Sequence, residues 1–218
     1  MRVGIVGGTG PAGRALAARL ASVGVDVVIG SRSADRAATT CEEIRKRWPD
    51  QPMWLEPGEN EAAADTELVI VATPWDAAPA TAESLAGELA GKVVVSMANA
   101  LAAEEGELRA VTPPRGSVAA GVQEAAPDAL VAAAFHHLPA RSLGDLSAPI
   151  SGDVLICTDS DQALEATADL VRRIPSLRPL HAGSLATAAP VEAFTAVLLG
   201  VNKRYRARTV LRLDGIPD

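Results

Sequence analysis

Cysteine is nearly absent from this sequence, which contains only Cys41 and Cys157. Two cysteines are too few for a disulfide framework, and each falls in a predicted regular element, so we expect reduced thiols that are buried or half-buried. A zinc site would require clustered cysteine and histidine. The two cysteines and the three histidines show no such ligand spacing, and we therefore expect no metal site.

Long apolar runs and excess positive charge are also lacking. No uninterrupted apolar run approaches the roughly 18 residues that a membrane span needs. A predicted core strand begins almost directly after Met1, which leaves no room for a signal peptide. The net charge of −7 argues against nucleic acid as the main partner. We therefore expect a cytoplasmic protein that binds neither membranes nor nucleic acid.

Side chains that could transfer a proton are scarce as well. Short-chain dehydrogenases need Tyr-x-x-x-Lys, but the only tyrosine, Tyr205, is followed four residues later by Thr209. The β-hydroxyacid dehydrogenases use a catalytic lysine and a long helical second domain. This sequence has three lysines, Lys46, Lys92 and Lys203, and its C-terminal part is short. No acid or base for catalysis is therefore evident.

The most informative segment is residues 3–32, VGIVGGTGPAGRALAARLASVGVDVVIGSR. It predicts a buried strand, a glycine-rich turn, a helix and a second strand. Gly8, Gly10 and Gly13 satisfy G-x-G-x-x-G: the first allows a tight turn, the second lets the backbone approach a pyrophosphate, and the third lets helix and strand pack closely. The N-terminus of the helix then faces the anion. Together these elements predict a dinucleotide site.

The end of the second strand indicates which dinucleotide binds. An NAD site places Asp or Glu there, whereas an NADP site replaces the acid with a group that accepts phosphate. Here Ser31 and Arg32 follow the strand without a carboxylate, and Arg36 lies at the start of the next helix. The guanidinium of Arg32 suits a phosphate, and the hydroxyls of Ser31 and Thr9 can donate to it. We predict NADP(H); the alternative is that Arg32 and Arg36 are solvated surface arginines.

Strand and helix patterns alternate along the chain. In residues 1–140 the predicted strands cover 3–6, 25–29, 53–56, 67–73, 92–96 and 130–135, with helices near 15–23, 35–48, 76–90 and 117–126 and irregular chain at 102–117. This alternation predicts an α/β fold, a Rossmann-like doubly wound parallel sheet with right-handed crossovers. Residues 141–218 predict a small C-terminal α/β lobe, packed on the sheet across a cleft, with strands at 153–157 and 178–181 and helices at 161–174 and 191–205.

Ligands of open α/β sheets lie at the carboxyl ends of the strands. Several segments besides the glycine-rich turn fall at such ends. Trp75 could line the nicotinamide pocket or simply pack at the start of a helix. The residues that we predict to bind cofactor are Gly8, Thr9, Gly10, Pro11, Ala12, Gly13, Ser31, Arg32, Arg36, Thr73, Pro74, Trp75, Met97, Asn99, Phe135, His136, His137, Leu138 and Pro139.

An NADPH site without a proton-transfer group fits a partner that is itself a hydride carrier, since the two cofactors then supply the chemistry. The chain resembles the NADPH-dependent reductases of coenzyme F420, also called F420H2:NADP oxidoreductases, over nearly its whole length. The matching features are GGTGPAG, IGSR, ATPWDA, KVVVSMANAL, AAFHHLPA and the run LHAGSL…EAFT…LLGVNKRY. The glycine motif is common to Rossmann proteins, whereas GSR followed by FHHLPA and the late AGSL stretch is more specific.

This resemblance implies that the nicotinamide lies near Thr73, Pro74 and residues 97–99. The 5-deazaflavin of coenzyme F420 would stack on it beneath residues 135–140 and the C-terminal lobe. Hydride would pass directly between the two rings, without a metal, a covalent intermediate or a catalytic side chain. The resemblance also implies a homodimer.

Two further features suggest contacts with the deazaflavin coenzyme. Five positive charges fall within ten residues near the C-terminus, and Arg206 and Arg208 among them could bind its phosphodiester and glutamate tail; the alternative is a helix C-terminus that favours cations. His136 or His137 could hydrogen-bond the deazaflavin ring. Adjacent residues after a strand point in opposite directions, so we expect at most one of the two histidines to line the cleft.

Two other functions remain open from the sequence. The same fold could reduce a flavin, a ferric chelate or an imine with NADPH. The chain could also be a non-catalytic NADP(H) sensor that signals through its dimer surface, since a sensor needs no acid or base.

Overall fold

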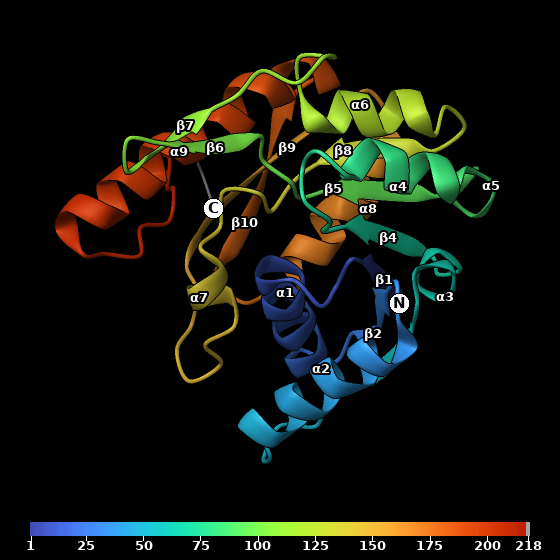
Figure 1. Ribbon diagram of the computed structural model, residues 1–218. Helices are drawn as coiled ribbons and strands as arrows, with labels where there is room; N and C mark the ends of the chain where they lie inside the picture. The colour runs from blue at the N-terminus through green and yellow to red at the C-terminus, as the bar shows by residue number, and fades with distance from the viewer. Residues whose placement is uncertain (217–218) are drawn as a thin grey trace.

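The structure is a computed structural model that describes residues 1–216. Its centre is an eight-stranded sheet with the order β10-β9-β8-β5-β4-β1-β2-β3 (Figure 1). The strands are β1 (Arg2–Val6), β2 (Asp26–Ser31), β3 (Leu55–Glu59), β4 (Leu68–Val71), β5 (Val93–Ser96), β8 (Leu130–Ala133), β9 (Gly152–Thr158) and β10 (Leu177–Gly183).

The pairing of these strands confirms the predicted Rossmann-like doubly wound sheet. The strands from β3 to β8 in the sheet order pair in parallel. β4 and β5 consist of buried residues only, with the sequences LVIV and VVVS. Such short β-branched runs are typical of parallel strands that helices cover on both faces.

The C-terminal strands extend this sheet. We expected residues 141–218 to pack on it as a lobe; instead, β9 pairs with the end of β8 in the antiparallel direction, and β10 then pairs with β9 in parallel. Extension satisfies the backbone groups that the edge of β8 would otherwise expose. The division of the chain at residue 140 therefore stays a prediction, but its two parts share one sheet.

Helices cover both faces of the sheet (Figure 1). One core cluster joins α1, α2, α8 and the short helix α7 (Ala140–Leu143) to one face, and a second cluster joins the remaining helices to the opposite face. The bounds on the first face are α1 (Pro11–Ser22), α2 (Ala34–Arg47) and α8 (Asp161–Arg172). Those on the second face are α3 (Asn60–Ala64), α4 (Ala78–Ser84), α5 (Ala86–Leu89) and α6 (Val118–Ala125), together with the start of α9 (Ala188–Tyr205) and a 3-10 turn at Leu185–Thr187.

Several predicted boundaries differ from the structure. The single helix expected at 76–90 is divided into α4 and α5. β3 lies two residues later than expected and includes Pro57 and Gly58, which an edge strand tolerates. A short helix, α7 (Ala140–Leu143), follows the segment after β8.

The segment expected to be irregular contains a β-hairpin. β6 (Leu101–Glu104) and β7 (Glu107–Ala110) pair in antiparallel fashion. Glu105 and Gly106 connect them with φ values of 49° and 81°. Two successive residues with positive φ form the turn type whose twist suits a two-residue hairpin. The prediction failed because Glu-Gly is a weaker turn signal than Asn-Gly or Asp-Gly.

The helical segment Leu185–Tyr205 is long and apolar enough to cross a membrane by length and composition, and 22% of its most apolar window is buried. Because Glu192 interrupts the apolar sequence of this helix, the sequence contained no uninterrupted apolar run that would have indicated it. Phe194 and Val197 are among the exposed apolar side chains of α9. The helix packs against β7, along the left side of Figure 1.

Candidate functional site

A pocket of about 650 Å³ lies at the carboxyl ends of β1, β2 and β4. Residues far apart in the sequence form its wall, because parallel strands end at the same edge of the sheet. Predicted cofactor-binding residues that line it are Thr9, Gly10, Ser31, Arg32, Arg36, Thr73 and Pro74. The structure therefore brings these seven residues together, while their contacts with a cofactor stay a prediction.

The glycine-rich turn is built differently from the expectation at one position. Gly7, and not Gly8, has the left-handed conformation of the tight turn, with φ of 71°. Gly8 is required for another reason, since a Cβ there would lie 2.8 Å from the carbonyl oxygen of Ile5. A Cβ on Gly13 would lie 2.9 Å from the Cα of Gly8. Gly13 therefore permits close packing of α1 on the turn, as predicted.

Gly10 has room for a side chain. The protein atoms nearest to a Cβ on Gly10 would be carbonyl oxygens at 3.6 and 4.0 Å, which is ordinary contact. Gly10 is also the N-cap of α1, where no side chain caps the helix and no acidic residue lies in the first turn. The amides of Ala12 and Gly13 thus remain available beside the pocket, and this cradle fits the pyrophosphate of a dinucleotide.

Asn60 holds the turn in place, a role that the sequence analysis missed. It is the first residue of α3, and its Oδ1 accepts a hydrogen bond from the backbone N–H of Gly7 at 3.1 Å. Asn60 itself lines the pocket. No motif pointed to it, because 53 residues separate the two partners.

The arginines at the end of β2 face the same pocket. Arg32 and Arg36 are exposed and form no ion pair with any residue in the described range 1–216. The hydroxyl of Ser31 accepts from the backbone N–H of Ser33 at 3.4 Å and can still donate to a ligand. Two guanidinium groups without a protein carboxylate partner suit a phosphate.

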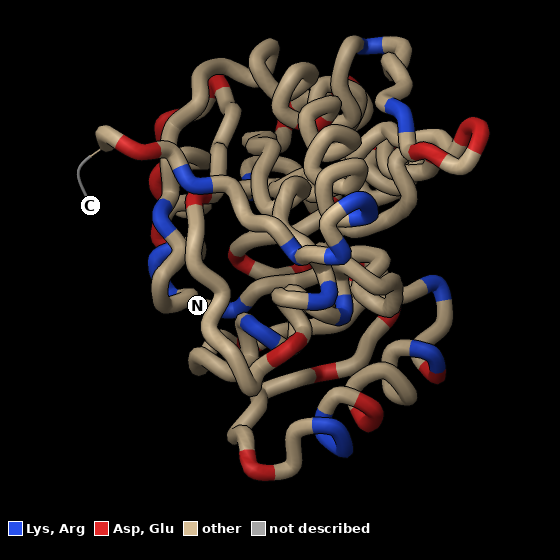
Figure 2. Tube along the Cα trace, turned by 90° about the vertical axis from the view of Figure 1, so that its left-hand side faces the viewer, with Lys and Arg blue, Asp and Glu red and all other residues tan. Residues whose placement is uncertain are grey.

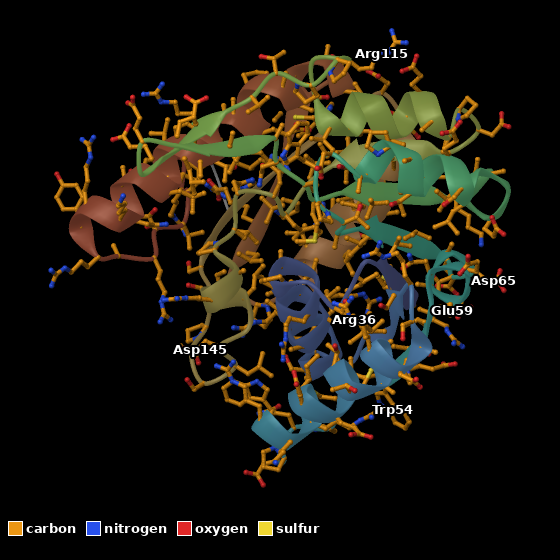
Figure 3. The ribbon with its side chains drawn as sticks, in the orientation of Figure 1. Arg36, Trp54, Glu59, Asp65, Arg115 and Asp145 are labelled. Atoms are coloured by element: carbon orange, nitrogen blue, oxygen red, sulfur yellow. The ribbon has the colours of Figure 1, made fainter. Side chains whose placement is uncertain are left out.

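Two carboxylates also line this pocket. Glu59 at the end of β3 is the register partner of Ser31, and Glu61 follows it in α3. Figure 3 labels Arg36 and Glu59 on neighbouring parts of this edge. The sequence correctly indicated that β2 itself ends without an acid, but it could not show that the adjacent strand supplies one.

Thr73 supplies a polar atom to the pocket wall without a protein partner. Its Oγ1 is buried and has no hydrogen bond with the described residues. A buried hydroxyl normally has a partner, so this atom fits a ligand group. Trp75 is outside the pocket and packs against the second core cluster, which favours the packing interpretation of this residue.

Met97 and Asn99 are engaged within the protein. Met97 belongs to the core. The Nδ2 of Asn99 donates to the carbonyl oxygen of His136 at 2.7 Å, and its Oδ1 accepts from the Thr195 hydroxyl at 3.2 Å. Asn99 thus ties the ends of β5 and β8 to α9. These contacts account for its side chain without a cofactor.

The chain turns sharply after β8. Phe135 has φ of 62°, which is unusual for a bulky residue and often marks a functional site. Its side chain is fully buried in the core, and that of Leu138 is nearly so. Pro139 is the N-cap of α7. The side chains of Phe135 and Leu138 therefore pack in the core beneath the turn, and almost none of their surface is accessible to a ligand.

His136 and His137 differ in their hydrogen bonds, but their rings lie edge to face with centroids 5.1 Å apart, so the two side chains do not point in opposite directions. That at most one of them lines the cleft stays a prediction. The Nε2 of His137 lies 2.9 Å from the carbonyl oxygen of Asp153. His136 is 4% exposed, and neither of its ring nitrogens has a hydrogen bond within residues 1–216. Burial and the adjacent His137 lower the pKa of His136 to about 3. His136 is therefore a neutral imidazole.

The positive charges near the C-terminus differ in their contacts. Lys203 contacts the carbonyl oxygen of Gly106, and Arg204 lies 3.6 Å from Glu107, both in the hairpin turn region. Arg208 lies 3.8 Å from Asp145, after α7. Arg206 is exposed and ends α9 in the left-handed conformation. Arg208 therefore has a carboxylate neighbour after α7, and the joint role of Arg206 and Arg208 at the coenzyme tail stays a prediction.

Glu192 is a buried carboxylate that the sequence analysis did not identify. Its two oxygens accept hydrogen bonds from the backbone N–H groups of Val118 and Ala119 at 2.9 and 3.1 Å, at the N-terminus of α6. Burial raises its pKa to about 7, although the two amides act in the opposite direction. Glu192 raises the pKa of the neighbouring Cys157 thiol further, which burial already elevates, to about 11.

The sheet order, the glycine-rich turn and the pocket at its strand ends are those of a Rossmann-type dinucleotide-binding protein. The family described as NADP oxidoreductase, coenzyme F420-dependent, matches residues 2–100. The F420-dependent NADP reductase of Methanocaldococcus jannaschii is 34% identical over 99% of both chains. That of Methanothermobacter marburgensis is 30% identical over 100% of both.

A solved structure agrees on the fold. It is a putative F420-dependent NADP reductase from Arthrobacter sp. FB24, which superimposes with a TM-score of 0.83 at 23% identity and covers 98% of this chain and 99% of its own. Given the full-length relatives, the chain belongs to the F420-dependent NADP reductase family.

Proposed function

We propose that the protein transfers hydride directly between NADP(H) and coenzyme F420. The observation that carries this proposal is the pocket at the strand ends. It is lined by the glycine backbone at Gly10 and by the guanidinium groups of Arg32 and Arg36, which form no ion pair within residues 1–216. Family membership supports the second substrate, since relatives that match over their whole length are named for both.

The residues of the pocket can hold NADP(H) in one orientation. Gly10 and the free amides at the start of α1 suit the pyrophosphate. Arg32, Arg36 and the hydroxyls of Ser31 and Thr9 suit the adenosine 2′-phosphate. Thr73 and Pro74, which line the same pocket at the end of β4, would contact the nicotinamide.

The deazaflavin would then lie over the segment from Phe135 to Pro139. His136 is the side chain in this segment that supports such a position, because its buried ring nitrogens have no hydrogen bond to any of the described residues 1–216. A neutral imidazole can donate to a ring carbonyl without adding a charge that opposes hydride transfer. Two cofactor rings held face to face supply the electronic chemistry themselves.

Two further parts of the proposal concern assembly and location. A homodimer is supported by the exposed apolar side chains of α9, which a second copy could cover. A cytoplasmic location is supported by the acidic net charge and the two free cysteines. Size-exclusion chromatography with light scattering tests the dimer: a monomer at micromolar concentration would contradict it.

The proposed reaction is tested by mixing the protein with NADPH and oxidised coenzyme F420 and following the loss of the deazaflavin's visible absorbance. Turnover at catalytic enzyme concentration is the expected result. Turnover with FMN, a ferric chelate or an imine but not with the deazaflavin would favour the other reductase. Tight NADPH binding without any turnover would favour the sensor.

A further inference from the structure

A second pocket, of about 510 Å³, lies next to the cofactor site, and we call it the arginine groove. It runs between α1, the C-terminal end of α2, and α7 with the loop that follows. Pro11, the first residue of α1, and Ala140, directly after the FHHLP segment, form one part of its wall. The groove therefore begins at Ala140, next to residues 135–139, over which the deazaflavin ring is proposed to lie.

The groove carries an excess of positive charge in an acidic protein. Its charged residues are four arginines, Arg14, Arg47, Arg141 and Arg208, against the two carboxylates of Glu43 and Asp145. Four positive and two negative charges give the groove +2, whereas the whole chain carries −7. Figure 2, which views the side with α7 and the end of α9, shows blue segments gathered near its middle.

Ion pairs within the groove neutralise only part of this charge. Arg14 lies 2.7 Å from Glu43, and Arg208 lies 3.8 Å from Asp145. Arg47 rests over the ring of Trp48 at 5.3 Å. Neither Arg47 nor Arg141 forms an ion pair with any residue between 1 and 216. The guanidinium groups of Arg47 and Arg141 are thus available to bind an anionic ligand.

The loop that forms one wall is held rigidly. Arg19 of α1, a buried residue, donates hydrogen bonds to four carbonyl oxygens of this loop, those of Ser142, Leu143, Asp145 and Ala148, at 2.6 to 3.2 Å. The charges of Arg47 and Arg208 also reach Asp145, whose pKa is lowered first by a hydrogen bond from Ser147 and then by these two cations. The hydrogen bonds of Arg19 therefore fix the backbone of the loop that carries Asp145, while Arg14, Arg47, Arg141 and Arg208 line the groove around it.

We propose that the arginine groove binds the anionic tail of the deazaflavin coenzyme, with Arg47 and Arg141 contacting the carboxylates of its glutamate chain. This inference rests on the proposed function, since it assumes that the deazaflavin ring lies over residues 135–139. It replaces the expectation that Arg206 and Arg208 act together: Arg208 lines the groove and Arg206 does not. A flexible chain of carboxylates suits several separated guanidinium groups better than one compact phosphate does.

The test compares two acceptors that share one ring. One is coenzyme F420 with its full glutamate tail, and the other is the same deazaflavin with only its ribityl side chain. The double variant Arg47→Glu and Arg141→Glu should raise KM for the tailed acceptor about tenfold at low salt, with the effect shrinking in about 0.5 M salt. KM for the tail-less acceptor and for NADPH should change less than about twofold.

Arg115→Glu is the matched control. Arg115 is an exposed arginine that Figure 3 shows far from Asp145, and its reversal should leave KM for the tailed acceptor unchanged. An equal rise in KM for both acceptors, or no rise for either, would overturn the inference while the proposed function stands. If neither acceptor is reduced, the proposed function fails by itself.

A binding measurement then still tests the groove. Calorimetry with γ-linked triglutamate should show binding to the wild type and at least a fivefold weaker affinity for the double variant. Equal affinity of both proteins for this peptide would contradict the inference. Displacement of the peptide by inorganic pyrophosphate at equal concentration would also contradict it, because the groove would then be a general polyanion site.

Discussion

The side chain of Asn60 accepts a hydrogen bond from the backbone N–H of Gly7, and it thereby joins the start of α3 to the turn that cradles the cofactor. Gly7 has positive φ and lies at the tightest point of the turn. Asn60→Ala would leave the amide of Gly7 without this partner, at a cost of about 1–3 kcal/mol. We expect a lower melting temperature and weaker NADPH binding, measured by thermal unfolding and fluorescence titration.

The variant Asn60→Asp separates the effect on stability from the effect on NADPH binding. Aspartate retains the acceptor, so stability should return to near that of the wild type. The added charge beside the turn should still weaken NADPH binding, because it repels the phosphates. A wild-type affinity in Asn60→Ala would show that the turn needs no support from α3.

Arg32 should determine the preference for NADPH. Its guanidinium lines the pocket without a carboxylate partner among the described residues. Loss of a charged hydrogen bond to phosphate costs about 1.5–3 kcal/mol, so Arg32→Ala should weaken NADPH binding about ten- to a hundredfold. NADH lacks the 2′-phosphate and should bind with nearly unchanged affinity. Equal losses for both cofactors would refute this role of Arg32.

Gly10 and Gly13 should respond differently to alanine. A Cβ on Gly10 meets only carbonyl oxygens at 3.6 Å or more, whereas a Cβ on Gly13 meets the Cα of Gly8 at 2.9 Å. Gly13→Ala should therefore destabilise the fold by about 1–3 kcal/mol. Gly10→Ala should unfold at the wild-type temperature and yet bind NADPH at least about tenfold more weakly, since its methyl group fills space for the pyrophosphate. Strong destabilisation by Gly10→Ala would contradict the open cradle.

Glu192 should make stability depend on pH. Its pKa in the folded protein is about 7, and that of an unfolded glutamate is about 4.3. Between these values the folded chain holds a proton that the unfolded chain has lost, so the unfolding free energy falls as pH rises through this window. The decrease due to this residue is about 4 kcal/mol.

Urea unfolding at pH 5 and pH 7.5 measures this effect. The wild type should lose more stability across this interval than Glu192→Gln, which cannot ionise and keeps one acceptor for the amides of Val118 and Ala119. The same pH dependence in both proteins would show that Glu192 does not titrate in this range.

The sequence was sufficient to predict the strands, turns and pocket residues that depend only on neighbouring residues in the chain. Buried β-branched runs such as LVIV predicted the parallel strands, and the glycine spacing predicted the turn before α1. The end of β2 predicted Arg32 and Ser31 at the pocket. Each of these follows from the few residues that surround it.

Features that depend on distant partners could not be predicted. The role of Asn60 depends on Gly7, and the presence of Glu59 in the pocket depends on the pairing of β3 with β2. The division of the C-terminal charges between the hairpin and the loop after α7 follows from tertiary packing. The side chain of Phe135 was expected at a ligand, but positive φ turns it into the core.

Direct hydride transfer is tested most closely with NADPH that carries deuterium at the transferred position of C4. The reaction is run in ordinary water with oxidised coenzyme F420, and the reduced deazaflavin is analysed by mass spectrometry and NMR. Because the two rings are proposed to meet without an intervening side chain, one deuterium should appear at C5 of the product in nearly every turnover. Reduced deazaflavin that contains only hydrogen at C5 would contradict direct transfer.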